Sequence, residues 1–283
     1  MSKQGKSKDL AEELKEYLSS YGIVKREDII NAYESHRSKR TIIRRLDELK
    51  DAGFIDILKA GQVEKYGIEA PNKKFKYVVL KQSLELIKHI DSVLELFDSG
   101  DDEDKLTALA EIDSYKNVYS LYPSQLDVLV RNLDEDNIEL TYYILVILSY
   151  NIIDKWNQPR DVPALLDKLR ILLAKISSLP QKHSALRGHV IALLGIYEDG
   201  AVIDQLTEDA RTMDDLSNVK DEYDKRYTAK VIESHRTVLF DLEIELRKDG
   251  KNTNAKVLSQ IRYQAKKNLG LVESGEIPGV DLK

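Results

Sequence analysis

The chain of 283 residues contains no cysteine. This absence excludes disulfide bonds, thiolate metal sites and cysteine nucleophiles. Long apolar runs are also missing: the longest, YYILVILSYNII at residues 142–153, is shorter than the roughly 18 residues that a membrane-spanning helix needs. The opening residues, MSKQGKSKDL, lack the apolar segment of a secretory signal. We therefore expect a soluble, cytoplasmic protein with no membrane partner.

Motifs for catalysis and metal binding are equally scarce. The histidines have no His-x-x-x-His pair or carboxylate at ligand spacing, so we predict no metal site. Gly5-Lys6-Ser7 resembles the end of a phosphate-binding loop, but the upstream glycine and the preceding strand are missing. No serine lies in a Gly-x-Ser-x-Gly turn. The sequence therefore predicts a protein that is not an enzyme and carries no cofactor.

Positive charge is concentrated in one part of an acidic chain. The formal net charge of the whole chain is −6, yet residues 37–81 contain 12 Lys or Arg against 6 Asp or Glu. Residues 82–283 contain 25 against 36, a net charge of −11. This asymmetry predicts an anion-binding segment attached to a body that repels nucleic acid.

The first 82 residues show the spacing of three helices followed by two strands. Apolar residues at helical spacing predict a helix that begins near Leu10 and stops at Gly22, and a second short helix over residues 26–35. Ser38 can cap a third helix that ends at Gly53. Strand-like runs follow at residues 54–58 and 74–80, joined by what we expect to be a polar loop.

This order resembles the winged helix-turn-helix family of DNA-binding domains over about residues 8–81. The residues that carry the resemblance fit the family's recognition-helix pattern; they are Ser38, Thr41, Ile42, Arg44, Leu46, Leu49, Gly53 and Ile55. The resemblance implies a DNA-binding domain of three helices and a β-hairpin over residues 1–82. It also implies that double-stranded DNA is the partner.

The third predicted helix separates its apolar and basic residues. On a helical wheel Ile42, Leu46 and Leu49 share one face, while Arg40 and Arg44 lie opposite. The N-terminal half of such a helix enters the major groove in helix-turn-helix docking, and the hairpin supplies a basic wing. We predict that Arg40 and Arg44 contact base edges and that Lys39, Arg45, Lys73 and Lys74 contact phosphates. The complete predicted DNA-binding set is Arg37, Ser38, Lys39, Arg40, Thr41, Arg44, Arg45, Lys59, Lys65, Lys73 and Lys74.

Residues 83–100 are predicted to form a connecting helix and linker that also joins two copies of the chain. An apolar seam runs along one side of this helix, formed by Leu84, Ile87, Ile90, Leu94 and Phe97. Doubling a half-site through a symmetric homodimer is how small DNA-binding domains commonly gain affinity. The alternative is that the seam packs within its own chain.

Residues 101–272 contain a self-similar pattern, and residues 273–283 are predicted to be a flexible tail. The segments LTYYILVILS, LRGHVIALLG and IESHRTVLFD align at a spacing of 46 residues and begin at Leu140, Leu186 and Ile232. Each follows a shorter helical segment, which predicts a repeat of two helices. The segment around Arg187 resembles the second helix of a HEAT repeat, so the expected fold is mostly α, with a winged helix followed by a HEAT-like body.

The most favoured function is a nucleoid-associated, DNA-binding transcriptional regulator, in which the helical repeats dimerise or bind a protein partner. A second hypothesis is a scaffold or adaptor whose winged helix binds protein instead of DNA. A third, a HEAT-like DNA glycosylase, is disfavoured by the net charge of −11 over residues 82–283, because a groove that cradles a duplex must neutralise phosphates.

Overall fold

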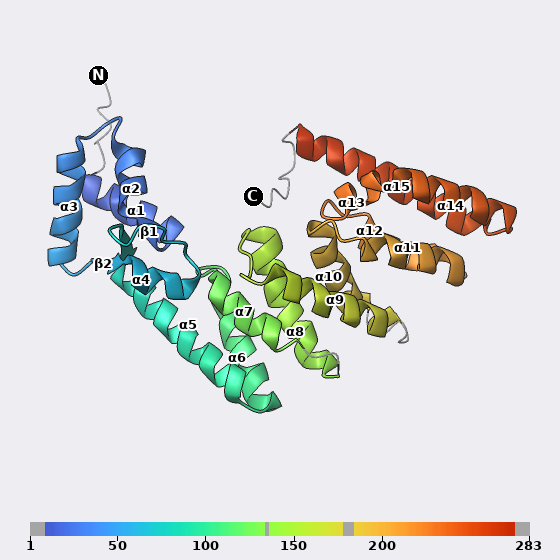
Figure 1. The fold of residues 1–283 in the computed structure, drawn as a ribbon, viewed down its shortest axis with the longest axis horizontal. Coiled ribbons are helices and arrows are strands. Elements are labelled where there is room, and N and C mark those ends of the chain that lie inside the picture. The colour runs from blue at the N-terminus through green and yellow to red at the C-terminus, as the bar shows by residue number, and fades with distance from the viewer. Residues whose placement is uncertain (1–8, 134–135, 178–183, 275–283) are drawn as a thin grey trace, which may run out of the picture. The chain divides into compact units, whose positions relative to one another are not determined.

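The computed structural model describes residues 9–133, 136–177 and 184–274, and these are mostly helical, with one small sheet (Figure 1). The chain divides into two compact units. The first comprises Met1–Asp104 together with Tyr122–Gln125, and the second comprises Lys105–Leu121 and Leu126–Lys283. From residue 275 onward, the expected tail lies outside the described residues.

The first unit contains the three expected helices and a three-stranded sheet in the order β1-β3-β2, with both pairings antiparallel. Its elements are α1 (Leu10–Tyr21), β1 (Val24–Lys25), α2 (Arg26–Tyr33), α3 (Lys39–Asp51), β2 (Ile55–Lys59), α4 (Ala60–Val63), the 3-10 helix η1 (Glu64–Tyr66), β3 (Lys76–Leu80) and α5 (Lys81–Ser99).

The core of the first unit forms where the apolar faces of these elements meet. Ile42 and Leu46 of α3 are fully buried and Leu49 is 5% exposed, which confirms the predicted apolar stripe. They share a cluster with Leu14 of α1 and Ile29 of α2. Burying one side of α3 leaves its opposite side free to carry charge.

The connection between β2 and β3 is not the polar loop that the sequence suggested. It contains α4 and η1, and Val63 and Tyr66 are buried there. The Tyr66 ring lies 5.4 Å from that of Tyr122, which belongs to the same unit. The segment folds because it has apolar side chains to bury, and four-residue helices are too short to leave a helical period in the sequence. The two-residue strand β1 was missed for the same reason.

All regular elements in the described residues of the second unit are helices. They are α6 (Asp102–Ser114) and α7 (Pro123–Arg131), which both begin in the first unit, α8 (Ile138–Ser149), the π-helix η2 (Tyr150–Asp154), α9 (Val162–Ser177), α10 (Ser184–Ile196), α11 (Ala201–Thr212), the 3-10 helix η4 (Leu216–Asn218), α12 (Lys220–Tyr223), α13 (Ala229–Ser234), α14 (Arg236–Lys248) and α15 (Asn252–Glu273).

The spacing of 46 residues corresponds to repeated burial, but the third copy is not a single helix. Leu140 in α8, Leu186 in α10 and Ile232 in α13 are all buried, as their alignment requires. In the third copy the helix ends at Ser234, and α14 begins two residues later with a new helical phase. The last aligned position is therefore lost: Phe240 is 45% exposed.

A buried ionic network ties three helices of the second unit together. Arg187 of α10 donates to Asp209 of α11 and, at 2.9 Å, to the Tyr223 hydroxyl of α12. That hydroxyl donates in turn to Asp209 Oδ2 at 2.8 Å. Glu222 Oε2 lies 2.8 Å from Arg187 Nη1. Each buried charged or polar group of the network contacts another member, so the network holds α10, α11 and α12 in one arrangement.

The network makes the stability of the second unit depend on pH. Burial raises the pKa of Glu222 from 4.5 to about 7, although the nearby Arg187 guanidinium opposes this shift. The folded protein therefore holds a proton that the unfolded chain has already lost, and stability falls as pH rises through the window from 4.5 to about 7. We expect this group to remove up to about 3 kcal/mol across that window.

Glu222→Gln isolates this contribution from other titrating groups. Urea unfolding at pH 5 and pH 8 can be followed by the fluorescence of Trp156, the only tryptophan, which lies in the second unit. The variant should lose less stability between these pH values than the wild type. Equal losses in the two proteins would contradict the assignment.

Candidate nucleic-acid interface

The N-terminal end of α3 is organised by a cap, and this cap uses two residues of the predicted DNA-binding set. The Ser38 Oγ accepts a hydrogen bond from the Thr41 backbone N–H at 3.2 Å, as an N-cap should. The two hydroxyl groups also lie 2.8 Å apart. Ser38 and Thr41 therefore hold the start of the helix, and their hydroxyl groups are already engaged within the chain.

Two of the predicted arginines are partly neutralised by acids. Arg45 Nη2 lies 2.7 Å from Asp9 Oδ1, and Arg45 Nη1 lies 2.8 Å from Glu48 Oε2. Arg44 Nε is 3.6 Å from the other oxygen of Glu48. Asp9 caps α1, so the Arg45 pair joins the start of α1 to α3. These contacts favour a bracing role for Arg45 over the predicted phosphate contact.

The basic residues nearest the start of α3 are the ones left open. Arg37, Lys39 and Arg40 are exposed, and the Arg37 guanidinium donates to the neighbouring His36 carbonyl at 3.0 Å. Lys39 and Arg40 have no acid partner among the described residues. Arg40 lies on the side of α3 opposite its buried residues and Lys39 lies at the edge of that exposed surface, so both can approach a phosphate backbone.

A second group of cations lies at the end of the β2–β3 hairpin that leads into the connection between the two strands. In the strand register Lys59 of β2 stands directly opposite Lys76 of β3, and both are exposed. Lys73 and Lys74, just before β3, are exposed as well. Like charges that face each other across a strand pair repel, and a bound anion would relieve that repulsion. Lys76 was missed by the sequence reasoning; its cross-strand position opposite Lys59 emerges only from the register.

Aromatic rings hold other cations of this unit. Lys65 of η1 lies over the ring of Tyr66, with Nζ 4.3 Å from the ring centroid. Lys25 of β1 lies over Phe75 at 3.8 Å. Lys65 is exposed and stacking on a ring leaves its ammonium hydrogens accessible, so it can still contact a phosphate.

The predicted dimer seam is covered by its own chain. All five side chains on α5 are at most 8% exposed in a single copy, with Ile90 and Phe97 fully buried. The alternative of packing within the chain therefore accounts for this seam, and a second copy would need another surface. Amphipathic spacing reports that one face of a helix is buried, but not what covers it.

Within the described ranges, no group of three or more histidine, aspartate or glutamate residues is placed to hold a metal ion. None of the described helices is both long and apolar enough to cross a membrane. No protein-family model, curated protein or solved structure matches the chain.

Proposed function

We propose that this protein is a DNA-binding transcriptional regulator. The first unit acts as a winged helix that reads duplex DNA through the start of α3 and through the hairpin. The second unit acts as a HEAT-like body that binds a protein partner. The observation that carries the proposal is that Lys39 and Arg40 are exposed and have no acid partner in the described part of the chain, with Arg40 opposite the buried side of α3.

The contacts on α3 refine which residue reads sequence. Arg40 is free to form the bidentate contact with guanine that arginine makes in the major groove, whereas Arg44 must first release Glu48. Lys59, Lys73, Lys74 and Lys76 supply the phosphate contacts of the wing. A homodimer would double the half-site, and it would have to form through a surface other than the apolar face of α5.

The test is a titration of full-length protein with mixed genomic duplex fragments, followed by affinity measurements on a selected site at several salt concentrations. Arg40→Ala should weaken binding to the preferred site by roughly 1–3 kcal/mol and reduce sequence preference. Lys74→Ala should weaken all sequences about equally and lower the salt slope by about 0.9.

Arg45→Ala is the matched control, because it removes an arginine of the same helix that is engaged by Asp9 and Glu48. It should leave sequence preference unchanged. The adaptor hypothesis gains support from the acids that neutralise part of α3. Wild-type protein that leaves every duplex unshifted at about 50 mM salt would favour the adaptor and end the DNA-binding proposal.

A further inference from the structure

The last helix of the second unit carries a basic surface that the acidic net charge of this region conceals. The exposed stripe of α15 recurs at helical spacing and consists of Lys256, Gln260, Tyr263, Lys266, Lys267 and Gly270, with the half-buried Ser259 among them. The opposite side, with Leu258 and Ile261, is fully buried. The net charge of −11 predicted a body that repels nucleic acid. An average over many residues does not describe one face, and this face is cationic.

Two hollows share Tyr263 on this surface, and both are lined by cations. One, of about 510 Å³, is lined by Arg236, Arg262, Lys266 and Lys267, together with Ser259 and Gly270. The other, of about 760 Å³, includes Lys220, Arg247 and Lys256. Asp224 is the only acidic side chain among the described residues that line either hollow, and it is paired with Lys220. Acids outside the lining pair with Arg236, Arg247 and Arg262, so the lysines of α15 are the cations left open to an anion.

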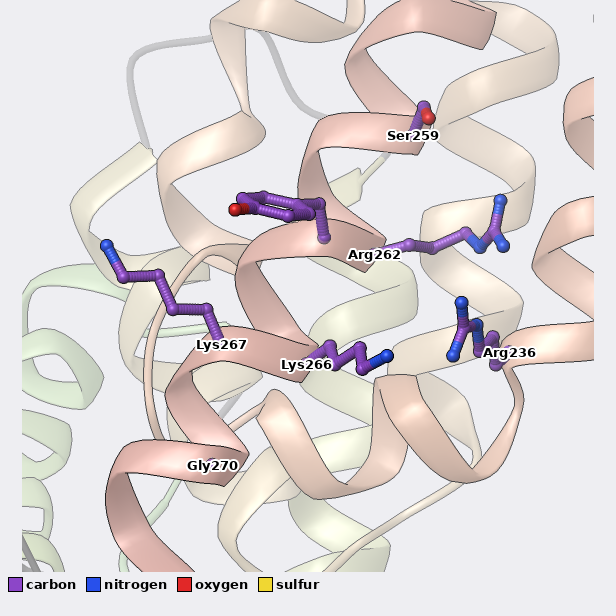
Figure 2. Close-up of a pocket in the computed structure, with 7 residues that line it drawn as sticks. Arg236, Ser259, Arg262, Lys266, Lys267 and Gly270 are labelled. Atoms are coloured by element: carbon purple, nitrogen blue, oxygen red, sulfur yellow. The ribbon is translucent and has the colours of Figure 1, made fainter. Parts of the chain in front are cut away.

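In the first hollow three cationic side chains converge. Arg236, Arg262 and Lys266 turn toward one another on one side of α15, with Lys267 on the other side (Figure 2). Arg262 is fixed by a 2.6 Å bond to Glu243 and lies over the Phe240 ring. Its Nε is buried without a hydrogen-bond partner in the described structure. Arg236 is also paired, with Glu233 at 3.2 Å, so Lys266 is the member of the three that has no acid partner among the described residues and can hold a phosphate without releasing one.

Tyr263 provides the second kind of contact. Its side chain is 72% exposed, among the most exposed of the large apolar side chains in the described chain, and cations lie on both sides of it along the helix. Base stacking on an aromatic ring flanked by cations is how proteins bind unpaired nucleic acid. The ring could not stack on bases that remain paired in a duplex. A membrane surface fits less well, because Tyr263 is the only large apolar residue of the stripe.

We propose that the exposed stripe of α15 binds single-stranded nucleic acid. The phosphates lie on Arg236, Lys266, Lys267 and Lys256, and a base stacks on Tyr263. From Lys256 to Lys267 the helix rises about 16 Å, the span of several nucleotides. This site is on the second unit and does not depend on duplex binding by α3.

The experiment measures binding of full-length protein to a fluorescein-labelled oligodeoxythymidine of about 20 nucleotides by anisotropy, over a salt series. All variants carry Lys39→Ala and Arg40→Ala, which silence the proposed duplex site. Tyr263→Ala should weaken binding about 5- to 150-fold, the range found when a stacking aromatic is removed. Lys266→Gln with Lys267→Gln should lower the salt slope by about 1.4.

Matched controls exist on the same unit. Tyr143→Ala removes a tyrosine that is 46% exposed on α8, and Lys155→Gln with Lys230→Gln removes two exposed charges elsewhere. Both controls should bind like the parent protein. The proposal is overturned by absence of binding at about 50 mM salt, by full binding of Tyr263→Ala, or by an unlabelled duplex or anionic lipid vesicles competing as well as the single strand. Failure of the duplex proposal is distinguishable from failure of this one, because it would appear with duplex fragments and with the variants Arg40→Ala and Lys74→Ala.

Discussion

Arg187→Ala is expected to destabilise the second unit by about 3–5 kcal/mol. The side chain is about nine-tenths buried and lies between Asp209 and Glu222, which are equally sheltered from solvent. Removing the cation leaves two buried carboxyl groups and the Tyr223 hydroxyl without their shared partner. The resulting loss in the free energy of unfolding exceeds what an exposed ion pair contributes. Urea unfolding followed by Trp156 fluorescence measures the effect, because the only tryptophan lies in this unit.

Two further variants separate this explanation from a general loss of an arginine. Arg211→Ala breaks a pair with Glu245 in which both side chains are about half exposed, so it should cost less than about 1 kcal/mol. Combining Arg187→Met with Asp209→Asn and Glu222→Gln removes all the charges together and should recover part of the loss. An Arg187→Ala protein no less stable than Arg211→Ala would show that the network is not a structural tie.

Ile87→Glu combined with Leu94→Glu is expected to unfold the first unit. Both side chains are buried within a single copy of the chain, at 1% and 3% exposure. Two carboxyl groups forced into that core should cost more than about 5 kcal/mol together, which is comparable with the whole stability of a small domain. Far-UV circular dichroism should then lose helix signal while Trp156 fluorescence still reports a folded second unit.

Leu96→Glu is the control for this variant because Leu96, on the same helix, is 50% exposed. It should change stability by no more than about 0.5 kcal/mol. Had the apolar seam joined two copies, the double variant would remain folded and only the sedimentation coefficient would fall. A folded, monomeric double variant made from a dimeric wild type would therefore restore the seam as a dimer interface.

Local patterns in the sequence were sufficient for the elements whose own residues determine them. Ser38 followed by the stripe of Ile42, Leu46 and Leu49 specifies a capped, one-sided helix, because each residue acts on neighbours within a turn or two. Apolar positions repeated every 46 residues likewise marked Leu140, Leu186 and Ile232 of the second unit, which are all buried. The elements that were missed, β1, α4 and η1, are too short to show any period.

Contacts between residues far apart in the sequence could not be predicted from local patterns. Asp9 reaches Arg45 across 36 residues, and Lys59 and Lys76 face each other only through strand register. Arg236 joins Arg262 and Lys266 at one hollow although 26 residues separate the first two in sequence.

The sequence by itself determined α1, α2 and α3 of the first unit, the buried side of α3 and the basic residues at its start, because periodicity, capping and residue charge are properties of neighbouring residues. Only the tertiary structure decided which arginines stay free, that the seam on α5 is already covered, and that cations gather on α15 within an acidic body. Packing decides which charged residues from distant parts of the chain come to lie on the same surface. The net charge of a sequence segment therefore does not give the charge of any one face of the folded protein.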